Sequence, residues 1–131
     1  MKPLGRLSGF VYSATRAVAG LLFSLHGTQK LFGVLGAEQA SEFFSLLGLA
    51  GVIEFVGGVL IMIGLYTPWV AFFASGEMAV AYFIAHAPGE PWPIMNGGEL
   101  AVLYCFVFLY FSSRGSGPLS LDRFVRGRGA V

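Results

Sequence analysis

Residues 43–66 read FFSLLGLAGVIEFVGGVLIMIGLY, and this stretch decides the class of the protein. It contains one charged side chain, Glu54. Because an α-helix rises about 1.5 Å per residue, about 20 apolar residues cross the hydrocarbon core of a bilayer. The stretch therefore predicts a membrane-spanning helix with a carboxyl group inside it.

Three further apolar blocks surround this stretch, at residues 10–31, 68–87 and 97–113. Pro68 suits the first turn of a helix, whereas the prolines and the glycine within 88–93 break the pattern before the last block. We therefore expect an all-α, integral membrane four-helix bundle that forms a single domain over residues 1–131.

The composition excludes other classes. Hydrophobic residues make up 56% of the chain and charged residues 11%, whereas about a quarter of the residues in a soluble domain are charged. A formal net charge of +1 with no dense basic patch argues against nucleic acid as a partner. With one cysteine, Cys105, and two histidines, we expect no metal site.

Basic residues lie near both ends of the chain: Lys2, Arg6, Arg114, Arg123, Arg126 and Arg128. Four spans bring both ends to one side of the membrane, and an excess of lysine and arginine marks the cytoplasmic side. The sequence therefore predicts a multi-pass protein of the bacterial inner membrane with both termini in the cytoplasm.

Three ionisable residues lie inside the expected spans, where each costs roughly 2.5–3.5 kcal/mol on insertion scales: Arg16, Glu54 and Glu77. Each lies roughly 12–17 Å from the cytoplasmic end of its helix, and small residues flank it on its own face. We expect them to form one layer. One arginine cannot neutralise both glutamates, and the carboxyl group left in excess could relay a proton or bind a ligand. The alternative is an ion cluster that only fixes the helix register.

A second polar layer is expected nearer the outside, from His26, Lys30, Asn96 and Glu99. Asn96 is a candidate N-cap of the last helix, and Glu99 falls in its first turn. Lys30 lies close in phase to Arg16, whereas His26 is displaced by about 80°, so Lys30 and Glu99 are the expected pair. A histidine at a helix end can also simply cap carbonyl groups, and a structural role for His26 stays open.

Two other residues are expected to lie outside these layers. His86 is about 180° from Glu77 on an ideal helix, and we expect it to face headgroups or an interface. Cys105 is about 120° from Glu99, and we expect a packed, small apolar residue there. The aromatic residues between 104 and 111 are typical of a core or a lipid-facing surface.

Three stretches resemble the DoxX family of small four-helix bacterial membrane proteins. The first joins Arg16 and Gly20 to HGTQKLFG at 26–33. The second runs from EFVGGVL at 54–60 to GLYT at 64–67. The third is NGGELAVLY at 96–104, followed by GSG at 115–117 and SLD at 120–122. The similarity extends over nearly the whole chain up to Asp122.

The resemblance implies an association with quinone-linked or thiol-oxidative-stress redox complexes. It implies site roles for Arg16, His26, Lys30, Glu54, Asn96 and Glu99, whereas Glu77 rests on depth and phase alone. The chain has no CxxC motif and no haem-ligating histidine pair within the bundle. We therefore expect an accessory subunit of an oxidoreductase complex rather than a stand-alone enzyme.

The expected ligand is a quinone or a lipid in the bundle, with no covalently bound cofactor. The expected partners are the lipid bilayer and either other membrane subunits or further copies of the chain. A non-catalytic structural or assembly subunit of a larger membrane complex is the alternative, and a small transporter is a third possibility.

Overall fold

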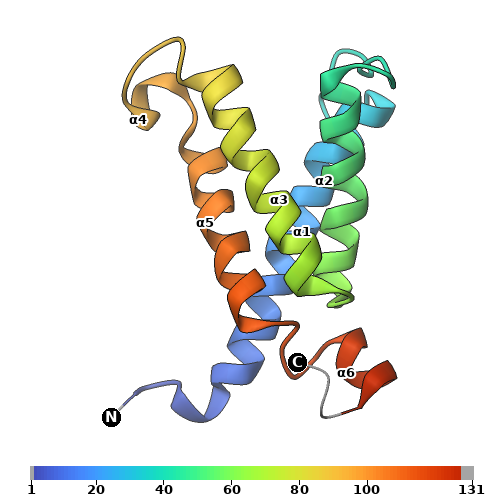
Figure 1. The fold of residues 1–131 in the computed structure, drawn as a ribbon, viewed down its shortest axis with the longest axis vertical. Coiled ribbons are helices and arrows are strands. Elements are labelled where there is room, and N and C mark those ends of the chain that lie inside the picture. Colours follow the sequence, from blue (N-terminus) through green and yellow to red (C-terminus); the bar gives the residue numbers. More distant parts are fainter. Residues whose placement is uncertain (1, 128–131) are drawn as a thin grey trace.

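The computed structural model describes residues 2–127, and within this range the chain is helical and has no strand. The elements in chain order are a 3₁₀ turn η1 (Gly5–Leu7), α1 (Ser8–Phe32), α2 (Leu46–Ile63), α3 (Thr67–Ala81), the π-helical η2 (Tyr82–His86), α4 (Pro93–Asn96), α5 (Glu99–Arg114) and α6 (Leu121–Arg126). Figure 1 shows their arrangement.

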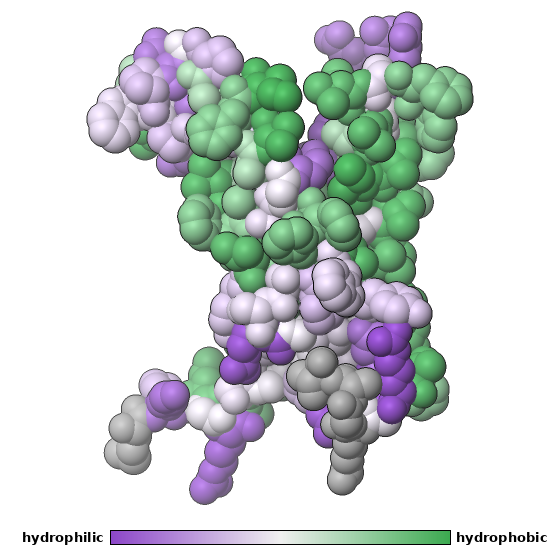
Figure 2. Space-filling model, in the orientation of Figure 1, coloured by the Kyte–Doolittle hydropathy of each residue, from purple (hydrophilic) through white to green (hydrophobic). Residues whose placement is uncertain are grey.

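The four long helices form two pairs. α1 packs along α2, and α3 packs along α5. The pairs meet at the end of the molecule that carries both ends of the described chain, and they diverge toward the opposite end (Figure 1). The fold therefore has the form of a V, and a cleft lies between its arms (Figure 2).

Glycines allow the close contact between α1 and α2. A Cβ on Gly20 would lie 2.4 Å from the Met62 nitrogen, and one on Gly58 would lie 2.4 Å from the Ser24 nitrogen. Further along the same contact, a Cβ on Gly27 would lie 2.3 Å from the Phe55 nitrogen. No side chain fits at these positions, so the glycines fix the register of the antiparallel pair.

An aromatic core joins α5 to the first pair. Phe23 of α1 and Phe108 of α5 are fully buried, with ring centroids 4.6 Å apart. Ala71 and Ala74 of α3 are equally buried, and their small side chains bring α3 close to this core. The core fills the closed half of the V and leaves the open half to the cleft.

The helix bounds differ from the predicted blocks where capping residues intervene. α2 begins at Leu46 rather than at residue 43 because Ser45 caps it, its hydroxyl accepting a hydrogen bond from the Gly48 nitrogen. It ends at Ile63, and Gly64 follows as the C-cap with a φ of +75°, which suits glycine. Asn96 is not the N-cap of α5: it ends the short helix α4, and Gly98 holds the N-cap position.

The segment after α5 forms a further short helix that the apolar blocks did not predict. The Ser120 hydroxyl accepts a hydrogen bond from the Arg123 nitrogen and so caps α6. Asp122 is buried, and its backbone nitrogen donates to the Gly64 carbonyl. This segment is thereby attached to the end of α2.

Within the described residues, two stretches are long and apolar enough to cross a membrane: Leu46–Ile63 and Thr67–His86. α1 is longer, at 25 residues, but contains Arg16 and Lys30. α5 has 16 residues, or about 24 Å, which is shorter than a hydrocarbon core of about 30 Å. Figure 2 shows apolar surface over the diverging arms and hydrophilic surface toward the end that carries the termini.

Candidate functional site

An ion pair between α1 and α2 forms the centre of the candidate site. Lys30 Nζ donates to Glu54 Oε1 at 2.5 Å. The Glu54 side chain is 2% exposed, whereas that of Lys30 is 28% exposed. Gly51 leaves room for the lysine, because a Cβ there would lie 3.0 Å from Lys30 Cβ. Glu54 lies in the middle of α2, and the long, flexible side chain of Lys30 reaches it from the last turn of α1.

Glu77 of α3 faces this pair from the other arm of the V. It lies within electrostatic range of both Glu54 and Lys30. Among the described residues, Oε2 of Glu54 and Oε2 of Glu77 are both buried and accept no hydrogen bond. The Lys30 ammonium group pairs with Glu54 and lies within electrostatic range of Glu77, and two buried oxygens are left to accept hydrogen bonds.

These residues line a cavity of about 960 Å³ between the arms (Figure 2). Its walls come from four helices and η2, and they are mainly apolar, with Leu46, Ile53, Phe72, Phe73, Ile84 and Leu100 among them. An apolar cavity with a few convergent polar groups is the usual form of a small-molecule site. The cavity opens in the half of the molecule away from the termini.

His26 and Tyr104 complete the polar lining near the ion pair. Both line the cavity, and their rings meet edge to face with centroids 6.3 Å apart. Tyr104 is buried and lies within electrostatic range of Glu54. The predicted core position of Tyr104 is confirmed, whereas its place in the cavity lining is not predicted by the sequence. Its spacing from the buried Ala101 and Phe108 is the signal that could have placed it on the inner face.

The predicted layer of Arg16, Glu54 and Glu77 is not formed. Arg16 lies nearer the end of the molecule that carries the termini, and it is 1% exposed. Its guanidinium donates to the carbonyl groups of Ile61 and Met62 at the end of α2, and to that of Leu119 at 2.5 Å. The glycine register explains this result, since it places Gly20 against Met62 and the Arg16 guanidinium beside Gly64, about 15 Å along α2 from Glu54. Arg16 therefore caps a helix end.

The expected pair of Lys30 and Glu99 is not formed either, because Lys30 pairs with Glu54. Glu99 does occupy the first turn of α5, as predicted, but it is exposed and does not line the cavity. Asn96 also lies outside the cavity lining, and its amide group donates to the Tyr82 hydroxyl at 3.2 Å and to the Glu90 carbonyl at 2.9 Å.

His86 lines the cavity instead of facing away from it. The change of helix type at η2 explains the difference, because a π-helix has more residues per turn than the α-helix assumed for the phase. The Nδ1 atom of His86 lies 3.1 Å from the Asn96 carbonyl oxygen. Cys105 is half-buried against the core, as expected, and it also lines the cavity beside Ser75.

Comparison with known proteins identifies the family of the chain. The DoxX family model matches residues 11–87, which is more than half of the chain. The chain belongs to the DoxX family. The matched region contains His26, Lys30, Glu54 and Glu77, so the carboxyl and ammonium groups of the site all lie within the family domain.

Two relatives extend the similarity beyond the matched domain. A Haemophilus influenzae protein named "Uncharacterized protein" is 42% identical, and the alignment covers 93% of this chain and 96% of that relative. A Bacillus subtilis protein named "Putative oxidoreductase CatD" is 30% identical, over 84% of this chain and 83% of the relative. No solved structure matches the chain at a significant level.

Within residues 2–127, no three His, Cys, Asp or Glu side chains come close enough to hold a metal ion. The polar groups that line the cavity can form hydrogen bonds or exchange protons, and they belong to Lys30, Glu54, Glu77, His26 and Tyr104.

Proposed function

We propose that this DoxX protein is a multi-pass inner-membrane subunit that binds a quinone-class ligand in the cavity between its helix pairs. It acts as an accessory subunit of a quinone-linked or oxidative-stress redox complex. One observation carries the proposal: two buried carboxyl oxygens that accept no hydrogen bond from the described residues belong to side chains that line, with Lys30, an apolar cavity of about 960 Å³.

The cavity chemistry fits a lipophilic molecule with a polar ring. Ligand cavities usually measure about 300–1,000 Å³ and combine apolar walls with a small number of polar groups. Apolar walls suit a ring and the start of an isoprenoid tail, and a hydrogen-bond donor suits a ring oxygen. A quinone supplies two-electron, two-proton redox chemistry when it is bound, and the electrons come from another subunit.

Each polar residue then has a distinct role in the cavity. Lys30 donates a hydrogen bond to a ring oxygen, and Glu54 holds the ammonium group in place through their 2.5 Å contact. Glu77 has no such ion-pair partner among the described residues and serves as the group that accepts or releases a proton. The similarity to a Bacillus subtilis protein named as an oxidoreductase supports a redox role of this kind.

The membrane orientation belongs to the same proposal. The two helices able to cross a membrane are joined by a tight turn at the end that also carries Lys2, Arg6, Arg114, Arg123 and Arg126. We place this basic end in the cytoplasm and the mouth of the cavity toward the outer leaflet. Arg128, the last of the basic residues near the chain ends, lies outside the described residues.

Ligand binding by the purified protein tests the proposal. We expect quinone to be found by mass spectrometry in solvent extracts of the protein, and added short-chain quinone to raise its melting temperature. Glu77→Gln and Lys30→Met should reduce both signals. Glu99→Gln is the matched control, because it removes a carboxylate that is exposed and outside the cavity.

An absence of quinone in the extract, together with no thermal shift for any variant, would overturn the ligand assignment. Recovery of the chain in fixed ratio with a larger complex whose activity survives Glu77→Gln would instead favour a structural or assembly subunit.

A further inference from the structure

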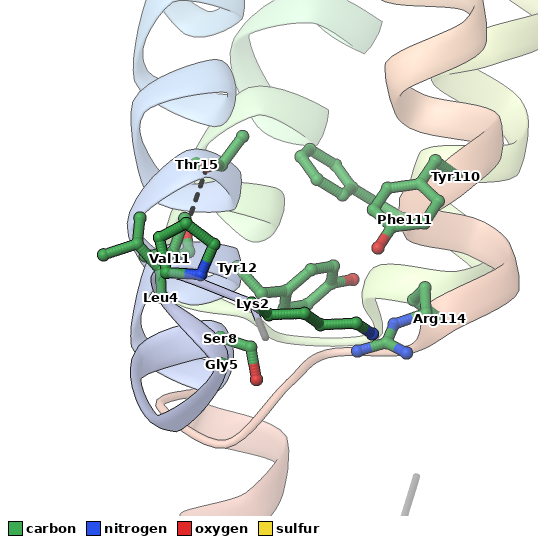
Figure 3. Close-up of a pocket in the computed structure, with 11 residues that line it drawn as sticks. Lys2, Leu4, Gly5, Ser8, Val11, Tyr12, Thr15, Tyr110, Phe111 and Arg114 are labelled. Atoms are coloured by element: carbon green, nitrogen blue, oxygen red, sulfur yellow. Dashed lines mark hydrogen bonds between the residues drawn. The ribbon is translucent and has the colours of Figure 1, made fainter.

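A second cavity, of about 520 Å³, lies at the opposite end of the molecule from the first. It is formed between the start of α1 and the end of α5, and Figure 3 shows its lining. Leu4, Val11 and Phe111 give it apolar walls. Its position at the basic end places it where the headgroups of one leaflet would lie.

Two cations point toward one another across this cavity, Lys2 from the segment before η1 and Arg114 from the last turn of α5 (Figure 3). No acidic residue lines the cavity, and among the described residues neither cation forms an ion pair. Two like charges that face the same cavity repel each other, and an anion bound between them offsets this repulsion.

Arg114 is held in place by its aromatic neighbour. Its guanidinium carbon lies 5.5 Å from the centre of the Tyr12 ring, a cation–π distance. Tyr12 is itself fixed, because its hydroxyl donates to the Gly115 carbonyl at 2.5 Å. A positioned guanidinium is the group best suited to hold a phosphate through paired hydrogen bonds. The Ser8 hydroxyl, which also lines the cavity, offers a further donor.

We propose that this cavity binds the phosphate headgroup of an anionic phospholipid. Lys2 and Arg114 pair with the phosphate, and the apolar walls contact the glycerol backbone and the first part of an acyl chain. A free phosphate ion would satisfy the cations but would leave the apolar walls in contact with water. This inference does not depend on what the larger cavity binds.

The test is a lipid titration of the full chain in detergent, followed by native mass spectrometry. We expect one phosphatidylglycerol to bind tightly and phosphatidylcholine to bind much more weakly. Lys2→Gln should weaken phosphatidylglycerol binding about tenfold, since a hydrogen bond between charged groups contributes at least that factor. Lys2 lies outside every helix, so this change leaves the fold intact. Adding Arg114→Gln should remove the specific binding, whereas Arg114→Lys should retain it in part.

The matched control is Arg6→Gln with Arg123→Gln, which removes two charges from the same end but none from the cavity lining. It should change the affinity less than about twofold, because exposed charges outside the site contribute little. Equal losses in the two double variants would overturn the proposal by showing a general charge effect. Displacement of the lipid by millimolar inorganic phosphate would overturn it in favour of a free-anion site.

Discussion

Lys30 holds the buried carboxylate of Glu54, and this pair can be tested by stability alone. Lys30→Met would leave a carboxylate that is 2% exposed without its ion-pair partner. We expect a loss of about 2 kcal/mol in the free energy of unfolding, because a stranded buried charge costs more than the pair contributes. Unfolding curves in mixed detergent micelles measure the loss.

The double variant Lys30→Met with Glu54→Gln supplies the control for this measurement. It removes the stranded charge, so most of the lost stability should return. If the single and double variants were equally destabilised, the ion pair would not be the source of the effect.

The charged residues show how far the sequence predicts the site. Composition and depth indicated that Glu54 and Glu77 lie inside the bundle, and the structure places both beside one cavity. Depth alone could not assign the cations. Arg16 is at a depth where it meets the carbonyl groups at the end of α2, while Lys30 reaches Glu54 over the space left by Gly51. A side chain's length and the register of the neighbouring helix decide such pairs.

At the scale of the helices, two adjacent glycines provide a sharp test of the packing. A Cβ on Gly58 would lie 2.4 Å from the Ser24 nitrogen, whereas a Cβ on Gly57 meets only side-chain atoms, the nearest being Val70 Cγ1 at 3.5 Å. Gly58→Ala should force α1 and α2 apart and cost about 1–3 kcal/mol. Gly57→Ala should be neutral or stabilise by up to about 1 kcal/mol, since alanine favours the helix.

Thermal or denaturant unfolding of the two variants, measured side by side, separates these effects. Equal stability of Gly57→Ala and Gly58→Ala would contradict the register that the glycines impose on α1 and α2.

Helix type and short helices limited the prediction at this scale. The apolar blocks located α1, α2, α3 and α5 because each one carries a long apolar pattern. They could not show that residues 82–86 are π-helical, and so the predicted angle between His86 and Glu77 around the helix was wrong. α6 has six residues, too few for a periodic pattern; Ser120 caps it, and the Asp122 nitrogen attaches it to the Gly64 carbonyl at the end of α2.

The proposed orientation can be tested on the whole molecule by cysteine labelling in cells, in a Cys105→Ala background. Glu38 lies in the loop between α1 and α2, and Arg123 lies on α6 at the other end, and both are exposed. We expect a membrane-impermeant maleimide to label Glu38→Cys in intact cells and to label Arg123→Cys only after lysis. The opposite pattern would reverse the orientation.

The most direct test of the central claim is to map where a quinone binds. A photoreactive quinone, cross-linked in membranes and located by peptide mass spectrometry, should attach to the cavity-lining parts of α2, α3 and α5. Unmodified quinone should compete with this labelling, Lys30→Met should abolish it, and Glu99→Gln should leave it unchanged. Labelling spread over the outer, lipid-facing residues and unaffected by competition or by Lys30→Met would contradict the account.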